Sequence, residues 1–175
     1  MSSTAKPYGP IMQIAYVVDD LHAAIDYWTE VMGVGPFLIL DNLVFENGYY
    51  LSKPLDLNMT AAMSFSAGLQ IELIYQHDNT PSIFTERRSK EGSIHHLAAF
   101  TEDLDASIAW LEARGGENLQ GADVPGGSRV AYVDMGSAGI LELAQLQPEV
   151  HQLFEMVRST AAQWDGQQKI LSLPG

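Results

Sequence analysis

The segment MQIAYVVDDLHAAIDYWTEVMGVG, residues 12–35, decides the fold because it joins a strand pattern to a helix pattern. Its first residues are apolar and β-branched, which is typical of a strand. Asp19 and Asp20 then offer an N-cap, and apolar residues recur at helical spacing until Gly33. These apolar residues are Leu21, Ala24, Ile25, Trp28, Val31 and Met32. We therefore expect a strand that leads directly into an amphipathic helix.

A second segment, HLAAFTEDLDASIAWLEARGG at residues 96–116, has the same order of features. It aligns with the first segment without gaps at an offset of 83 residues, which pairs Ala15 with Ala98 and Asp20 with Asp103. Runs typical of strands follow both helices: LVFENGYYL, MTAAMSFSAG and LQIELIYQ after the first, SRVAYVDM and ILELAQL after the second. Each half closes on a Glu-Leu pair, in QIELI and ILELA. Duplication of one βαβββ unit is the simplest explanation. The alternative is that two unrelated strand–helix units merely look alike.

The boundaries of these units follow from composition. The segment between them is polar and contains Pro81 and Gly92, which is typical of a linker. Pro148 suits the first turn of a helix, and a helical stripe that includes Phe154 and Trp164 follows it. We expect one domain over residues 1–175, with units at 10–78 and 94–147, a linker at 79–93 and a C-terminal helix at 148–166.

Composition restricts the classes of partner. The formal net charge of −13 repels nucleic acid and anionic membranes, so we expect neither as a partner. No apolar run approaches the roughly 18–20 residues that span a bilayer, and MSSTAKPYGP lacks the apolar core of a signal peptide. The absence of cysteine excludes disulfides and thiolate metal sites. We expect a cytoplasmic protein that acts on a small molecule or a protein partner.

Four predicted strands each carry one strong polar side chain opposite the face that suits packing under a helix. Because successive side chains of a strand alternate between faces, these four share one face of the sheet. They are Gln13, Glu72, His96 and Glu142. Taken singly, such a glutamate is usually an exposed edge residue, and such a histidine is usually a hydrogen-bonded core residue. Their matched positions in the two halves instead favour convergence on one axis inside a curved sheet.

Two carboxylates on that axis indicate a metal site. Burying both without a cation would be costly, because like charges would share a low-dielectric space. A divalent metal offsets that cost, and two carboxylates, one imidazole and one amide oxygen would leave two positions open for substrate or water.

These motifs resemble the vicinal oxygen chelate superfamily, the glyoxalase/bleomycin-resistance/extradiol-dioxygenase group, over about residues 10–147. The resemblance implies an α+β fold of two βαβββ modules that form an open, curved mixed β-sheet barrel, with the C-terminal helix outside it. It also implies a homodimer, because members of the superfamily often pair. Its metal ligands come from the first and last strands of each module. Carried over by motif, they are Gln13 in IMQIAYVVDDL, Glu72 in LQIELIYQ, His96 in IHHLAAFTEDL and Glu142 in ILELAQL.

Within that superfamily, residues 71–106 look most like methylmalonyl-CoA epimerase, although Gln13 stands where epimerases usually carry histidine. The acidic base of the epimerases lies in a Glu-Gln-Gly context. The corresponding neighbourhood of this chain reads KPLDLNMTAAM, in which Asp56 is the acidic residue. Glyoxalase I is similar in its Gln/Glu/His/Glu ligand set, but Val17 and Gly92 occupy its glutathione-binding arginine positions. Extradiol dioxygenases need a second histidine ligand, so ring cleavage is the less favoured chemistry.

The resemblance implies a divalent-metal-dependent isomerase, epimerase or lyase that abstracts a proton next to a carbonyl and stabilises an enediolate on the metal. Glu142 is the first candidate for the base, Glu72 the second and Asp56 the third. Mostly oxygen ligation suits Zn, Ni, Co, Mn or Mg. The substrate would be a small-molecule carbonyl compound in an apolar pocket lined by Ile74, Phe100 and Leu146, which share the polar residues' face.

Two further functions stay open. One is a metal-free protein that sequesters a small molecule, as bleomycin-resistance proteins do. The other is an interaction protein that buries Phe154 and Trp164 of the C-terminal helix between subunits.

Overall fold

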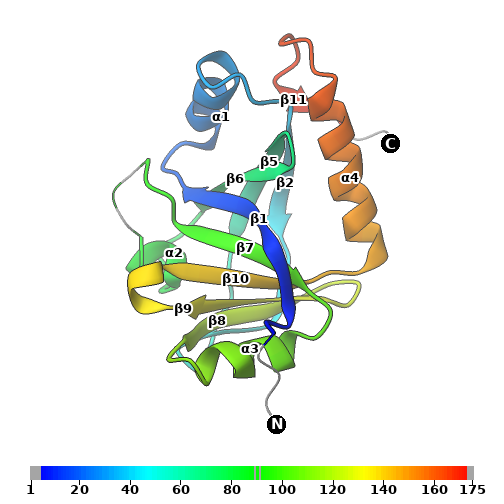
Figure 1. Cartoon of the computed structure of the whole chain (residues 1–175). Helices are drawn as coiled ribbons and strands as arrows, with labels where there is room; N and C mark the ends of the chain where they lie inside the picture. Colours follow the sequence, from blue (N-terminus) through cyan, green and yellow to red (C-terminus); the bar gives the residue numbers. More distant parts are fainter. Residues whose placement is uncertain (1–4, 89, 91, 173–175) are drawn as a thin grey trace.

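The computed structural model describes residues 5–88, 90 and 92–172. Within these residues, eleven strands form one curved, open sheet, and four α-helices pack around it in a mixed α+β fold (Figure 1). The predicted fold class is therefore confirmed. No helix in the described parts is long and apolar enough to cross a bilayer.

The two βαβββ units occupy the two halves of the sheet in mirrored order. In the first unit the strands lie in the order β2-β5-β6-β1, and in the second they lie in the order β7-β10-β9-β8. The first unit comprises β1 (Tyr8–Val17), α1 (Leu21–Glu30), β2 (Phe37–Leu43), β5 (Met59–Ser66) and β6 (Leu69–Gln76). The second comprises β7 (His96–Thr101), α3 (Leu104–Glu112), β8 (Glu117–Val124), β9 (Ser128–Asp134) and β10 (Ile140–Gln145). Antiparallel pairing of β1 with β7 joins the halves at the centre.

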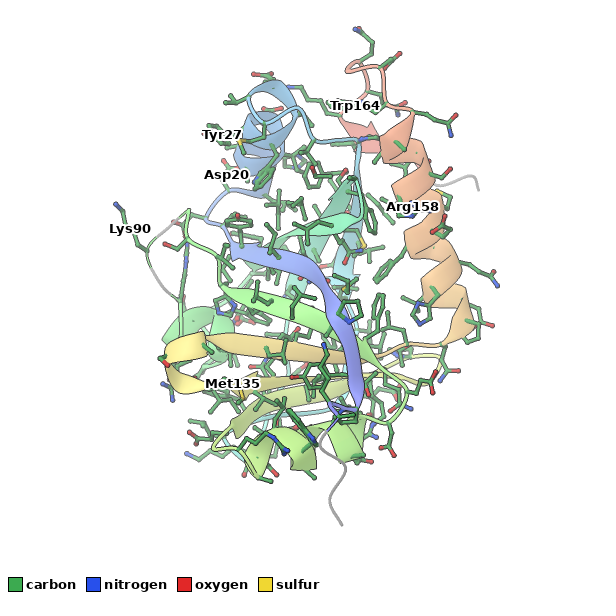
Figure 2. All side chains as sticks on the ribbon, viewed as in Figure 1. Asp20, Tyr27, Lys90, Met135, Arg158 and Trp164 are labelled. Carbon is green, nitrogen blue, oxygen red and sulfur yellow. The ribbon has the colours of Figure 1, made fainter. Side chains whose placement is uncertain are left out.

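Helices α1 and α3 begin at the aspartates that the sequence indicates. Asp20 Oδ1 accepts a hydrogen bond from the Ala23 backbone N–H at 2.9 Å, and Asp103 Oδ1 accepts one from Ala106 at 3.0 Å. Figure 2 labels Asp20 at the start of α1. Both helices pack on one face of the sheet, here called the outer face, where Ile25 of α1 is buried. The opposite, inner face is left for the polar side chains.

One predicted strand run occupies an unexpected place. The segment LVFENGYYL was expected among the strands of the first half, but it forms β3 (Glu46–Tyr50), which pairs with β8 of the second half. A short strand, β4 (Lys53–Pro54), follows β3 at this edge. The physical reason is burial: the Tyr50 side chain enters the inner core beneath the second half, and its hydroxyl donates to Glu86 Oε2 at 3.0 Å. The first half is completed instead by β2, which begins with the buried Phe37 and Leu38.

The linker supplies a short helix, α2 (Ile83–Glu86), which begins at a capping box on Ser82. Its Ile83 and Phe84 side chains are fully buried in the inner core. The linker is therefore part of the packed interior.

The C-terminal helix α4 (Pro148–Ala162) runs beside the sheet in Figure 1. Its Val157 is fully buried against the inner-face residues Met63 and Phe65 of β5. Phe154 stacks on Phe100 of β7, with ring centroids 6.3 Å apart. Trp164, labelled in Figure 2, approaches Gly35 so closely that a Cβ there would meet its ring at 3.0 Å. Both aromatic side chains thus contact their own domain, and the chain then adds β11 (Ile170–Leu171) beside β2.

Candidate metal centre

Four adjacent central strands, β6, β1, β7 and β10, bring the predicted ligands together. In the pairing register, Ala15 of β1 lies opposite both Glu72 and His96. Ala98 of β7 lies opposite both Gln13 and Glu142. Each alanine therefore stands between two long polar residues of the neighbouring strands. Since an alanine side chain ends at Cβ, the polar side chains have room to turn toward one another.

The distances show a tight group. One ligand-type atom from each of Glu72, His96 and Glu142 lies within 4.8 Å of the others. His96 Nε2 is 2.9 Å from Glu142 Oε2 and 3.7 Å from Glu72 Oε2. Gln13 joins the group through its amide Nε2, which donates to Glu72 Oε2 at 2.6 Å. The side chains are 0% exposed for His96, 10% for Glu142 and 14% for Glu72, so the group is nearly removed from water.

Burial makes ionisation of the two carboxyl groups costly. It raises the pKa of Glu72 to about 8, and the negative charge of Glu142 adds to the rise. It raises the pKa of Glu142 to about 7, against the lowering effect of a hydrogen bond from Tyr132. No lysine or arginine in the described part of the chain forms an ion pair with either carboxylate. The site therefore has an excess of potential negative charge, which a cation would neutralise.

The two adjacent histidines are buried and neutral. His95 Nε2 lies 3.0 Å from the Ile83 carbonyl oxygen of α2, and its Nδ1 lies 2.9 Å from His96 Nδ1. Burial lowers the pKa of His95 to about 4, and the neighbouring His96 is a smaller cause of the same shift. Burial also lowers the pKa of His96 to about 4. A neutral imidazole is the form that binds metals.

The donor set fits a divalent cation. Two buried carboxylates and a neutral imidazole face one another, and carboxylate and imidazole ligands suit Zn, Mn, Co or Ni. Gln13 presents its amide nitrogen to Glu72, and a half-turn of that amide would present the oxygen instead. The group therefore offers the types of ligand atom that a divalent metal binds.

Sequence reasoning missed two neighbours of this group. Tyr132 of β9 lies directly opposite Glu142 in the register, and its ring centroid is 5.2 Å from that of His96. Strand alternation predicts that His95 faces away from His96, yet its side chain turns back to contact His96 and α2. The alternation within SRVAYVDM shows which residues share the face of Tyr132, but only the pairing with β10 reveals its partner.

The structure separates the residues that were predicted to line one apolar pocket. Ile74 is fully buried among Ile83 and Phe84 of α2. Phe100 instead contacts α4 and borders a cavity of about 190 Å³ that Met12 and Phe65 also line. Leu146 is half-buried just after β10. Ile74 and Phe100 therefore lie toward different helices, and a substrate pocket between them stays a prediction.

The third candidate base lies elsewhere. Asp56 is exposed in the segment between β4 and β5. It does not belong to the Glu72, His96 and Glu142 group found among the described residues.

Comparisons with known proteins agree with the fold. A sequence model of the Glyoxalase/Bleomycin resistance protein/Dioxygenase superfamily matches residues 12–132. The methylmalonyl-CoA epimerase from Mycobacterium tuberculosis has a TM-score of 0.56 and 19% identity, over 87% of this chain and 97% of that one. A hypothetical protein from Bacillus halodurans has a TM-score of 0.55 and 17% identity, over 79% of this chain and 94% of that one.

A second solved methylmalonyl-CoA epimerase has a TM-score of 0.52 and 19% identity, over 82% of this chain and 99% of that one. At such identities the likeness shows a shared fold and nothing more specific. A search of curated proteins finds no match.

Proposed function

This chain belongs to the glyoxalase/bleomycin resistance protein/dioxygenase superfamily, and on that premise we propose that it is a divalent-metal-dependent enzyme that abstracts a proton next to a substrate carbonyl. The reaction would be an isomerisation or epimerisation, or a lyase reaction that begins with the same proton transfer. One observation carries the proposal: Glu72, His96 and Glu142 converge within 4.8 Å in a buried site with no lysine or arginine paired to them among the described residues.

Each of the four polar residues has a proposed role. Gln13, Glu72, His96 and Glu142 would hold the cation. When bound, a divalent cation supplies Lewis-acid polarisation of a substrate oxygen. His96 and Gln13 have no further role, because neither is placed to accept a proton from carbon while acting as a ligand.

We propose Glu142 as the base and Glu72 as the second candidate. In the metal-free chain burial raises the pKa of Glu142 to about 7, which makes its carboxylate more basic than an exposed one. A bound cation would lower that basicity, so the base would be a weakly held ligand. Tyr132 lies opposite Glu142 in the strand register and lowers the pKa of that carboxyl group. In an isomerase the Glu142 carboxyl group would return the abstracted proton to a neighbouring carbon. In an epimerase the proton must arrive on the opposite face of the same carbon, and Glu72, whose pKa is raised to about 8, is the candidate donor.

The experiment begins with metal analysis of the purified chain. We expect one divalent cation per chain, lost in the variants Gln13→Ala, Glu72→Ala and Glu142→Ala and retained in the control Glu102→Gln, which changes an exposed residue. Metal-free protein that takes up none of Zn, Ni, Co, Mn or Mg would contradict the proposal. Tight binding of a small molecule by such protein would instead favour the sequestering function.

Activity is then assayed as metal-dependent exchange of a proton next to a carbonyl, followed by NMR in deuterated water. Acyl thioesters are the first compounds to test, because methylmalonyl-CoA epimerases share the fold. Simple ketones and aldehydes form the comparison set. Exchange that does not depend on the added metal would count against the proposed mechanism.

A further inference from the structure

His95 lies beside the proposed metal ligand His96, and both of its ring nitrogens are already engaged. We infer that His95 is a positioning residue that fixes the tautomer of His96, through a hydrogen-bond relay that begins at the backbone of α2. The inference rests on the proposed metal site, because its consequence is that Nε2 of His96 is kept free for a cation.

The relay begins at a fixed peptide group. The Ile83 backbone N–H donates to Gln120 Oε1 at 3.0 Å, and Gln120 is only 2% exposed. The Ile83 carbonyl lies 3.0 Å from His95 Nε2. Since a carbonyl oxygen can only accept a hydrogen bond, the proton of this contact resides on Nε2 of His95.

The hydrogen bond between the His95 and His96 rings contains one proton. The Nδ1 atoms of His95 and His96 are 2.9 Å apart, so one nitrogen donates and the other accepts. If His95 donated, both of its nitrogens would carry protons and the ring would be a cation. His95 is 8% exposed and packs against the Phe84 ring, with centroids 5.5 Å apart. No carboxylate among the described residues contacts His95, so a buried cation there would be costly and His96 Nδ1 is the donor.

The tautomer of His96 follows from this assignment. With its Nδ1 proton committed to His95, the Nε2 atom keeps a lone pair directed at Glu142 and Glu72. An outer partner commonly fixes the tautomer and ring orientation of a metal-ligating histidine in this way. In this chain the partner is a second imidazole, anchored in turn to the linker helix.

The same geometry excludes a different role for His95. A metal ligand needs a free ring nitrogen, whereas Nε2 of His95 faces Ile83 and its Nδ1 faces His96. His95 therefore acts through His96 and not on a cation directly.

The first test observes the tautomer in the full chain without any metal. Histidine labelled with ¹⁵N would be followed by NMR at about pH 7. We expect a pyrrole-type Nδ1 and a pyridine-type Nε2 for His96, with a pyrrole-type Nε2 for His95. The reverse assignment for His96 would overturn the inference. This readout is independent of metal binding, so it still decides the relay if the proposed metal function fails.

The second test compares two substitutions at one position. The amide of His95→Gln can donate to the Ile83 carbonyl and accept from His96, whereas His95→Phe can do neither. We expect His95→Phe to weaken Co²⁺ binding by about tenfold to a hundredfold in calorimetry. His95→Gln should restore most of this affinity, and the exposed control His22→Gln should leave it unchanged.

The outcomes separate a tautomer effect from general damage. Wild-type affinity in folded His95→Phe would overturn the inference, as would an equal loss in both variants with an unchanged His96 tautomer. If His95→Phe does not fold, the NMR assignment in wild type and in His95→Gln decides the question.

Discussion

The Nε2 atom of His96 lies 2.9 Å from Glu142 Oε2, although 46 positions separate the two residues in the chain. Both side chains are buried, and His96 is neutral because burial lowers its pKa to about 4. One shared proton therefore holds the pair together while no cation is bound. A cation at this site would replace that proton, so metal uptake and proton release should be coupled.

Glu142→Gln tests the proposed base. The amide keeps the shape of the side chain and an oxygen ligand, but it cannot accept a proton from carbon. We expect metal-dependent proton exchange to fall by about a hundredfold or more, a typical loss for a general base, while the chain stays folded. Glu72→Gln is the matched variant, measured by the same NMR exchange assay. A larger loss in Glu72→Gln than in Glu142→Gln would assign the base to Glu72.

The stability of the metal-free protein should fall as the pH rises above 6.5. Burial raises the pKa of Glu72 to about 8 and that of Glu142 to about 7, from an ordinary value of 4.5. Folded-state stability from these groups is fully present below pH 4.5 and is lost as the pH rises through about 7 and 8. The pH dependence that His95 and His96 give to folding stability has the opposite sign. Their contribution is lost as the pH falls from 6.5 toward about 4.

Urea unfolding between pH 6.5 and 9 measures this effect. The double variant Glu72→Gln/Glu142→Gln should lose most of the pH dependence in this range. Added Zn²⁺ or Mn²⁺ should stabilise the wild type more at the higher pH, because the ligands must be ionised to bind. A metal-free wild type that gains stability above pH 7 relative to the double variant would contradict this interpretation of the site.

Tyr132→Phe should shift the pH profile of the reaction. The Tyr132 hydroxyl donates to Glu142 and so lowers the pKa of that carboxyl group. Without the donor, the pKa of Glu142 should rise further, and the midpoint of the rate profile should move to higher pH. Tyr49→Phe, which removes a hydroxyl that bonds to Asn118 outside the site, is the control. An identical midpoint in wild type and Tyr132→Phe would show that Glu142 does not control the rate.

Val157→Ala tests the packing of α4. Val157 is fully buried against Leu38, Met63 and Phe65, so its truncation should lower the free energy of unfolding by about 1–3 kcal/mol. The exposed control Ser159→Ala should change it by less than about 0.5 kcal/mol.

The same experiment bears on the homodimer that the family resemblance implies, which stays a prediction. We expect the loss in Val157→Ala to be independent of protein concentration, because its contacts lie within one chain. A concentration-dependent loss would place α4 at a subunit interface instead. Sedimentation of the wild type measures the oligomeric state directly.

The sequence by itself determined where α1 and α3 begin and which face of their strands the four polar residues occupy. Asp20 and Asp103 mark where α1 and α3 begin, because their side chains cap the free N–H groups of the first turn. Strand alternation places the four proposed ligands on the face opposite the helices, since side-chain direction depends only on neighbouring residues. These features are local, and local patterns encode them fully.

Only the tertiary structure decided which of these residues meet. Tyr132 faces Glu142 because β9 and β10 pair in one register, and His95 reaches Ile83 because the linker helix packs into the interior. Strand β3 pairs with β8 at the edge of the second half because Tyr50 is buried there. Alternation is identical in every register, so the choice of partner depends on how the whole sheet buries its side chains.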